Sequence, residues 1–160
     1  PYHIWNFDLE PASFLYSYAA NFKSIQYLRL DGKDVKSDQI KENVLSAIAI
    51  GYAPTFGFSV FPSLDEGPDI PVPDESEAPA GGHAVLAVGY DDNRPNWHFN
   101  MANQEWEEVS RGALLIRNSW GTSWGDHGYG WLPYEFIDWG LADDFWVCLK
   151  QDWVNLATFS

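Results

Sequence analysis

The spacing of apolar residues predicts two helices in the first third of the chain. Apolar side chains recur every three or four positions within residues 11–22 and again within residues 38–50, which is the period of a helix that buries one face. Ser37 is expected to cap the second helix, because a serine hydroxyl can accept from the exposed amides at a helix start. Gly51 follows that helix at the position where a left-handed glycine commonly ends one.

The remaining apolar runs are short and predict strands. They occupy residues 24–30, 55–61, 84–90, 112–117, 129–132 and 145–149. Gly57 indicates a bulge or a close backbone approach within its strand, and residues 134–137 are expected to form a helical turn. Residues 91–93 should turn the chain, with a loop or irregular hairpin over residues 91–111. This order of elements favours the α+β class, with N-terminal helices and an antiparallel sheet or partial barrel.

Residues 62–80 are expected to form a long surface loop. The segment holds five prolines and six acidic residues, and proline cannot donate a backbone hydrogen bond to a sheet. A loop of this length in a compact domain is either a solvated excursion or a functional segment.

The charge and composition narrow the range of partners and cofactors. The formal net charge is −14, which argues against nucleic acid or an anionic membrane as a partner. No apolar run is long enough to span a membrane. No His, Cys, Asp or Glu residues have metal-ligand spacing, and no glycine loop has the context of a phosphate site, so neither a metal nor a cofactor is expected. Cys148 is the single cysteine, which excludes an internal disulfide without fixing the cellular compartment.

Gly81, Gly82 and His83 precede one apolar strand, and Asn118 ends another. If these strands are antiparallel neighbours, His83 and Asn118 lie at the same end of the sheet. The asparagine carbonyl could then accept from one imidazole nitrogen, while the other nitrogen faces a nucleophile. The two glycines would leave the imidazole approachable. The alternative is a structural histidine, and surface or packing roles are expected for the other three: His3, His98 and His127.

Trp120 and Trp124 follow Asn118 among several glycines. They are expected either in the core or as a wall that keeps water from the bond between Asn118 and His83. These interpretations are compatible, because a hydrogen bond strengthens where the local dielectric is low.

Two segments together closely resemble the papain-like cysteine peptidases. They read Gly-His-Ala-Val-Leu-Ala-Val-Gly-Tyr-Asp-Asp at 82–92 and Leu-Ile-Arg-Asn-Ser-Trp-Gly-Thr-Ser-Trp-Gly-Asp-His-Gly-Tyr-Gly at 115–130. The resemblance extends from about residue 37 to residue 149 and is stronger to prokaryotic members than to lysosomal cathepsins. It implies a papain-like fold and a peptide or protein substrate.

The resemblance also implies a role for each matching residue. His83 would be the general base and acid, Asn118 would orient it, and Trp120 would shield the pair. The non-primed substrate pocket would be lined by Phe58, Gly81 and Gly82, and it would accept an apolar side chain.

The nucleophile of that family has no match in this sequence. In the family a cysteine lies in the N-terminal half, whereas Cys148 lies in an apolar strand, where we expect an inert, small buried side chain. Residues 1–160 are therefore expected to be the C-terminal, histidine- and asparagine-bearing part of a papain-like domain. The chain starts at Pro1 without a signal-peptide pattern, and we interpret it as processed or truncated.

Two functions remain open from the sequence. The chain could be the base-bearing part of a peptidase whose cysteine comes from an upstream segment or a second chain. It could instead be an inactive papain-like module with a binding or structural role. In either case the aromatic residues around His83 should attract a companion chain or a second copy, because exposed apolar patches favour association.

Overall fold

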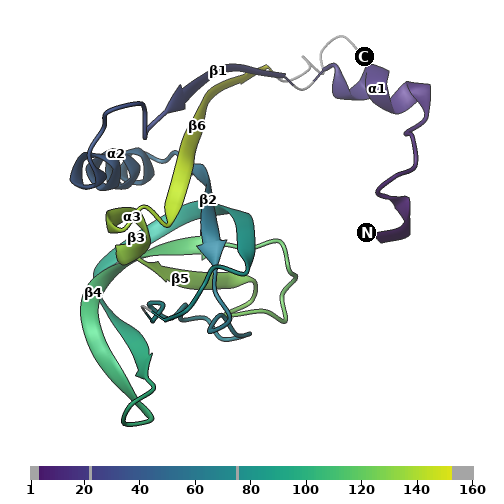
Figure 1. Cartoon of the computed structure of the whole chain (residues 1–160). Helices are drawn as coiled ribbons and strands as arrows, with labels where there is room; N and C mark the ends of the chain where they lie inside the picture. The colour runs from purple at the N-terminus through teal and green to yellow at the C-terminus, as the bar shows by residue number, and fades with distance from the viewer. Residues whose placement is uncertain (1–3, 22, 75, 153–160) are drawn as a thin grey trace. The chain divides into compact units, whose positions relative to one another are not determined.

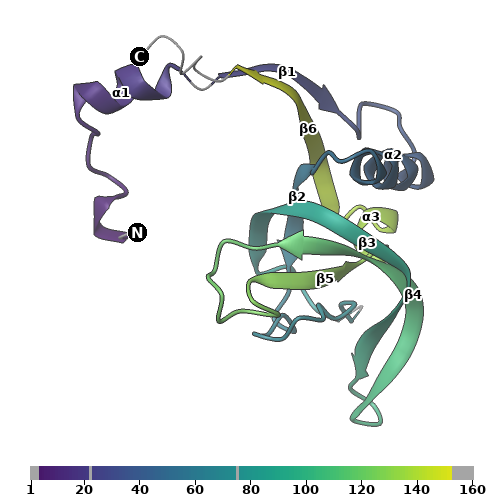
Figure 2. The ribbon, with the colours of Figure 1, turned by 180° about the vertical axis from the view of Figure 1, so that it is seen from behind.

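The computed structural model describes residues 4–21, 23–74 and 76–152, and it confirms the α+β class (Figures 1 and 2). The elements in chain order are η1 (Ile4–Asn6), α1 (Ser13–Ala19), β1 (Lys23–Arg29), α2 (Ser37–Ala49), β2 (Thr55–Val60), β3 (Gly81–Asn100), β4 (Glu105–Arg117), β5 (Tyr129–Pro133), α3 (Glu135–Asp138) and β6 (Ala142–Asp152). None of the described helices is long and apolar enough to cross a membrane.

The described residues divide into two compact units. One unit holds the residues up to Tyr27 and those from Cys148 onward, and the other runs from Leu28 to Val147. In the first unit, α1 is shorter than the predicted helix and buries none of its residues. Its apolar side chains therefore have no core within the described chain; Phe14, for example, is 70% exposed.

The six strands form one sheet in the order β1-β6-β2-β3-β4-β5. The pairings of β2 with β3, β3 with β4, β4 with β5 and β2 with β6 are all antiparallel. The sheet is open, with β1 and β5 at its edges, so the predicted antiparallel sheet is confirmed. The register between β2 and β6 shifts between Thr55 and Gly57, which is the irregularity that Gly57 predicts.

The core of the second unit lies between the sheet and the helices that cover it. Phe56 of β2 stacks on Phe145 of β6 with ring centroids 4.6 Å apart, and α2 contributes the fully buried Val44. Phe58 lies two positions after Phe56 and is also buried, because alternate residues of a strand point to the same face. The short helix α3 adds Phe136, which is 1% exposed.

Helix α2 ends as the sequence predicts but begins differently. Gly51 has φ +92°. The Gly51 amide donates to Ile48 (3.0 Å) and the Tyr52 amide to Ala47 (2.9 Å), the bonding pattern of a glycine-closed helix. The expected cap at Ser37 is wrong: Ser37 is already helical, and Lys36 holds the cap position without a side-chain bond.

Residues 70–73 overturn the expectation that the whole proline-rich segment lies on the surface. All four are buried. The amide of Ile70 donates to Trp131 (3.0 Å) and that of Val72 to Trp97 (2.9 Å). Pro71 and Pro73 alternate with these two residues, so the positions that lack an amide hydrogen are those where the strands offer no acceptor. The segment packs against β3 and β5.

The expected turn at residues 91–93 is also wrong, because β3 continues through it to Asn100. The pairing of β3 with β4 instead shifts register between Asp91 and Pro95, so the polar residues mark a bulge. The irregular hairpin predicted here is confirmed, and it extends beyond the rest of the sheet in both views (Figures 1 and 2). At the bulge, Asp92 accepts from the Tyr134 hydroxyl at 2.8 Å, and burial together with this carboxylate raises the pKa of Tyr134.

Gly130 of β5 should be intolerant of a side chain. A Cβ there would lie 2.6 Å from Cη2 of Trp124 and 3.1 Å from the carbonyl oxygen of Pro68. We expect Gly130→Ala to lower the free energy of unfolding by about 1–3 kcal/mol, because neither neighbour can move freely. Urea unfolding of the chain measures the change. Gly81→Ala is the control, since a Cβ at that strand glycine meets nothing within 4 Å, and equal losses in both variants would contradict the steric explanation.

Candidate active site

The pairing of the strands brings His83 and Asn118 together at one end of the neighbouring strands β3 and β4. His83 lies near the start of β3, opposite Phe58 of β2. Leu86 of β3 pairs with Arg117, the last residue of β4, and Asn118 follows directly. Because the two strands are antiparallel, the start of β3 and the end of β4 lie side by side.

The hydrogen bonds of Asn118 select the tautomer of the neutral imidazole. His83 Nε2 lies 2.8 Å from Asn118 Oδ1, and the Ser119 amide donates to the same oxygen at 2.7 Å. An amide nitrogen cannot accept the Ser119 bond, so the oxygen faces His83 and Nε2 must donate. In the neutral ring the other nitrogen, Nδ1, then carries no hydrogen and can act as a base.

A glycine-rich turn holds Asn118 in place. The Asn118 amide donates to the carbonyl of Gly128 at 2.9 Å, and the Gly128 amide donates to Trp124 at 2.8 Å. Gly125 has φ +56° within this turn, a conformation that glycine adopts at low cost. Asn118 Nδ2 is buried and has no hydrogen-bond partner among the described residues.

The two tryptophans of this turn occupy different layers. Trp120 stacks on the His83 ring with centroids 4.6 Å apart and planes at 27°, and it is 46% exposed. Trp124 meets Trp120 edge to face at 5.6 Å, is 5% exposed and donates from Nε1 to the carbonyl of Asp65. Trp124 is therefore a core residue that supports Trp120, and of the two only Trp120 stacks on the imidazole.

A shallow hollow of about 390 Å³ adjoins His83, and Phe58 and Gly82 both line it. Phe58 is only 5% exposed, and its ring meets the imidazole edge to face at 6.0 Å. Gly81 is not part of the lining. The structure thus brings two of the three predicted pocket residues together beside His83.

Asp143 also lines this hollow, and the sequence analysis missed it. No hydrogen bond or ion pair of its side chain occurs among the described residues, whereas Asp144 pairs with Arg29 and accepts from Trp146. Two consecutive aspartates at the start of β6 were the available signal. Only the backbone at β6 decides which of them faces the hollow.

The remaining candidates lie outside this cluster. Cys148 is half-buried on β6, whereas the sequence analysis expected a buried side chain. His98 lies 3.6 Å from Asp74 and His127 is exposed, while His3 is outside the described residues. Within the described part of the chain, no group of three His, Cys, Asp or Glu side chains could hold a metal ion.

Comparison with protein families gives one match over most of the chain. The family described as papain family cysteine protease matches residues 20–143. An uncharacterised peptidase C1-like protein of Acanthamoeba polyphaga mimivirus is 32% identical over 157 residues, which cover 91% of this chain and 45% of that protein.

Solved structures show the same similarity. Xylellain, a cysteine protease from Xylella fastidiosa, matches with a TM-score of 0.66 and 35% identity, over 91% of this chain and 46% of its own. The clostridial cysteine protease Cwp84 shares the fold, with a TM-score of 0.57 and 22% identity over 91% of this chain and 32% of its own. The chain thus spans about half the length of the mimivirus protein and of xylellain.

Removing the Asn118 side-chain carbonyl should change the tautomer ratio of the His83 ring. In Asn118→Ala, Nε2 loses its acceptor, and a hydrogen bond worth about 1 kcal/mol corresponds to a roughly fivefold change in the tautomer ratio. Long-range ¹H–¹⁵N NMR of the neutral His83 ring measures that ratio. Ser119→Ala, which keeps the backbone amide, should leave the ratio unchanged. The same ratio in both variants would show that Asn118 does not set the tautomer.

Proposed function

Because this chain belongs to the papain family of cysteine proteases, we propose that it supplies the histidine and asparagine of a peptidase with a Cys-His-Asn triad. His83 is the general base and acid, and Asn118 is its orienting residue. The cysteine comes from an upstream segment or a second chain. The observation that carries the proposal is the 2.8 Å contact between Nε2 and Oδ1, which leaves Nδ1 of His83 available.

The proposed chemistry uses each nitrogen of His83 for one task. Nδ1 takes the proton of the cysteine thiol, and the thiolate attacks the carbonyl carbon of the scissile peptide bond. The C–N bond then breaks as the imidazolium returns the proton to the leaving amine. Water, deprotonated by the same nitrogen, hydrolyses the thioester. Asn118 accepts from Nε2–H throughout, which holds the ring in position while its charge changes.

Exposed apolar surface supports a companion for this chain. Trp120 is 46% exposed although it covers the His83 ring, and α1 exposes large apolar side chains such as Phe14 and Tyr18. Exposed apolar patches usually mark surfaces that another protein segment covers. We propose that the cysteine-bearing half of the domain is that segment.

The retained geometry favours an enzyme over an inactive binding module. A binding module has no evident need for a histidine whose tautomer is fixed by one residue and whose face is covered by another. The residue at the nucleophile position separates these functions: cysteine supports the peptidase, whereas serine, alanine or glycine there would support the inactive module.

The activity should require both halves and His83. We expect the 160-residue chain alone to show no thiol-dependent hydrolysis of a fluorogenic peptide. The full-length protein with its upstream segment should hydrolyse it, and His83→Ala should lower kcat/KM by at least about 10³-fold, as loss of a triad base does elsewhere.

His127→Asn serves as the control, because His127 is an exposed histidine in the same glycine-rich turn and asparagine tolerates its positive φ. It should keep full activity. If the full-length protein has an upstream cysteine but a thiol-directed inhibitor labels no residue in it, the peptidase proposal is wrong.

Asp143 should make the substrate hollow favour a basic side chain. Its carboxylate shares the hollow with Phe58 and Leu141, so the hollow combines apolar walls with one negative charge. In the full-length enzyme, Asp143→Asn should lower kcat/KM about tenfold for an arginine-containing peptide and leave a leucine-containing peptide unchanged. Asp144→Asn is the adjacent control, since Asp144 does not line the hollow. Equal losses on both peptides would indicate a structural effect instead.

A further inference from the structure

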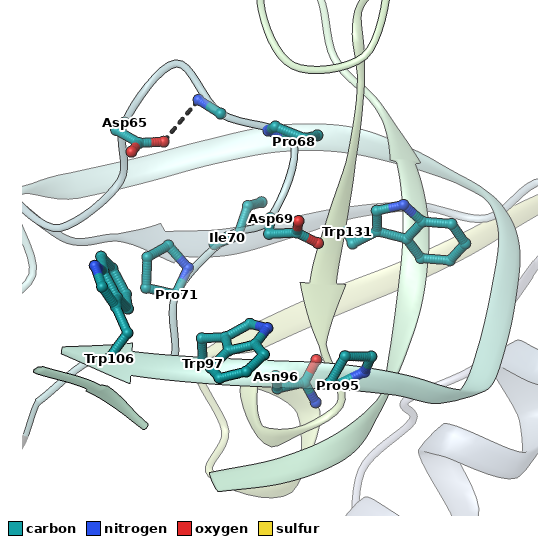
Figure 3. A pocket seen from close by; sticks show the side chains of 11 residues that line it. Asp65, Pro68, Asp69, Ile70, Pro71, Pro95, Asn96, Trp97, Trp106 and Trp131 are labelled. Carbon is teal, nitrogen blue, oxygen red and sulfur yellow. Dashed lines mark hydrogen bonds between the residues drawn. The ribbon is translucent and has the colours of Figure 1, made fainter. Parts of the chain in front are cut away.

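A second hollow, of about 250 Å³, lies in the same unit as His83 and is lined by three tryptophans (Figure 3). These are Trp97 of β3, Trp106 of β4 and Trp131 of β5. Trp97 is 39% exposed and Trp106 is 52% exposed, so both indoles offer apolar surface to a ligand. The peptidase chemistry uses none of these rings.

Trp97 and Trp106 stand on the same face of the hairpin that β3 and β4 form. Phe99 pairs with Trp106 across the two strands, and their rings meet edge to face with centroids 5.3 Å apart. Trp97 lies two positions before Phe99 and therefore points to the same face. It is the diagonal neighbour of Trp106, at a spacing of roughly 7–8 Å. The strand register thus gives the hollow two half-exposed indoles on one side.

A buried asparagine presents a fixed acceptor to this hollow. Asn96 is only 4% exposed. Its Nδ2 lies 2.9 Å from Ser110 Oγ, 2.9 Å from the Gly112 carbonyl and 3.3 Å from Glu135 Oε2. An oxygen could not take this place, because a carbonyl and a carboxylate only accept, so Oδ1 lies on the other side, toward the hollow (Figure 3). No hydrogen bond to Oδ1 occurs among the described residues, and a donor on a ligand would satisfy it.

The lining near Asn96 has no unbalanced charge. Asp69 also lines the hollow, but Arg94 donates to its Oδ1 from both Nε and a terminal nitrogen, so the guanidinium balances the carboxylate. Asp69 Oδ2 forms no hydrogen bond among the described residues and remains a second acceptor. Asp65 lies at the other end of the lining and is turned toward the Gly67 amide (Figure 3), so a ligand at Asn96 does not depend on it.

The hollow therefore combines hydrogen-bond acceptors, indole N–H groups and apolar ring faces. No hydrogen bond from the indole nitrogen of Trp97 or Trp106 occurs within the described part of the chain, so both can donate to a ligand. A neutral ligand with several hydroxyl groups and an apolar C–H face matches all three, because each hydroxyl can both donate and accept. These are the properties of a pyranose sugar.

Other classes of ligand match this lining less well. An anion would meet the acceptors of Asn96 and Asp69 on a chain whose net charge is −14. A cation would find the Asp69 carboxylate already paired with Arg94. An apolar ligand would bury Asn96 Oδ1 without a donor, which is costly. A proline-rich peptide could stack on the indoles, but its prolines have no backbone N–H to donate to that oxygen.

We propose that this hollow binds a neutral saccharide. The C–H face of a pyranose ring lies on the indoles of Trp97 and Trp106, whose ring faces carry partial negative charge. One sugar hydroxyl donates to Asn96 Oδ1, and a second donates to the Asp69 carboxylate. This site is independent of the peptidase function proposed above.

Titration of the 160-residue chain with three neutral trisaccharides tests the proposal. The probes are cellotriose, maltotriose and tri-N-acetylchitotriose, which differ in linkage and in substituents. In ¹H–¹⁵N NMR spectra at least one probe should shift, in a saturable way, the indole N–H signals of Trp97 and Trp106 and the side-chain amide signal of Asn96. The indole signal of Trp139 should not shift, because Trp139 lies outside this lining.

Sorbitol and hexaproline are the control probes. Sorbitol has hydroxyl groups but no ring face, and it should bind at least about tenfold more weakly than the best trisaccharide, since the contact with the two indoles is lost. Hexaproline tests the peptide alternative and should also bind more weakly.

Two tryptophan variants separate the platform from general effects of losing an exposed ring. Trp106→Ala should weaken binding of the best trisaccharide about threefold to tenfold, because one of the two ring faces is removed. Trp139→Ala is the matched control, since Trp139 is 56% exposed against 52% for Trp106, and it should leave binding unchanged. If Trp106→Ala lowers the thermal unfolding midpoint, Trp106→Phe replaces it, with a smaller loss of binding expected.

Several outcomes would overturn the proposal. These are no saturable shift with any trisaccharide, binding of sorbitol or hexaproline as tight as that of the best trisaccharide, equal losses in the Trp106 and Trp139 variants, or shifts that leave the Asn96 amide unchanged. The source of the sugar follows from a further comparison. Tighter binding of the trisaccharide than of the methyl glycoside of its repeating unit would indicate a glycan chain, and equal binding would indicate a single sugar.

Discussion

The antiparallel pairing of β3 with β4 is the constraint on which the candidate site depends. Leu86 pairs with Arg117, so His83 and Asn118 both lie beyond that pair, at the same end of the two strands. Their contact is 2.8 Å long although they are 35 residues apart in sequence. A shift of this register by one residue would turn each side chain to the opposite face and would separate the imidazole from its acceptor.

Packing of aromatic side chains, from the buried Trp124 to the exposed Trp120, also orients the His83 ring. Trp124 is buried and anchored by its bond to the carbonyl of Asp65; it supports Trp120, and Trp120 lies on the imidazole. Phe58 meets the ring from β2. His83 is thus oriented by two rings and one amide: Phe58 comes from β2, whereas Trp120 and Asn118 belong to the glycine-rich turn that follows β4.

Asp65 links the tryptophan layer behind His83 to a second hollow lined by Trp97, Trp106 and Trp131. Its carbonyl holds Trp124 behind the site, and its carboxylate lines the tryptophan-rich hollow. Exposed apolar side chains occur in both units, for example Phe14 on α1 and Trp120 over the His83 ring, and the companion segment that we propose would cover surface of this kind.

The sequence by itself determined most of the elements and predicted that His83 and Asn118 lie together, as their 2.8 Å contact shows. Apolar periodicity and glycine positions are local signals, so α2, β2 and the end of α2 at Gly51 could be predicted. Tertiary structure decided what depends on distant partners. Residues 70–73 are buried because β3 and β5 accept their amides, residues 91–93 bulge because β4 continues beside them, and Asp143 faces the hollow whereas Asp144 bonds elsewhere. No local pattern encodes these outcomes, because each is set by backbone that lies far away in the sequence.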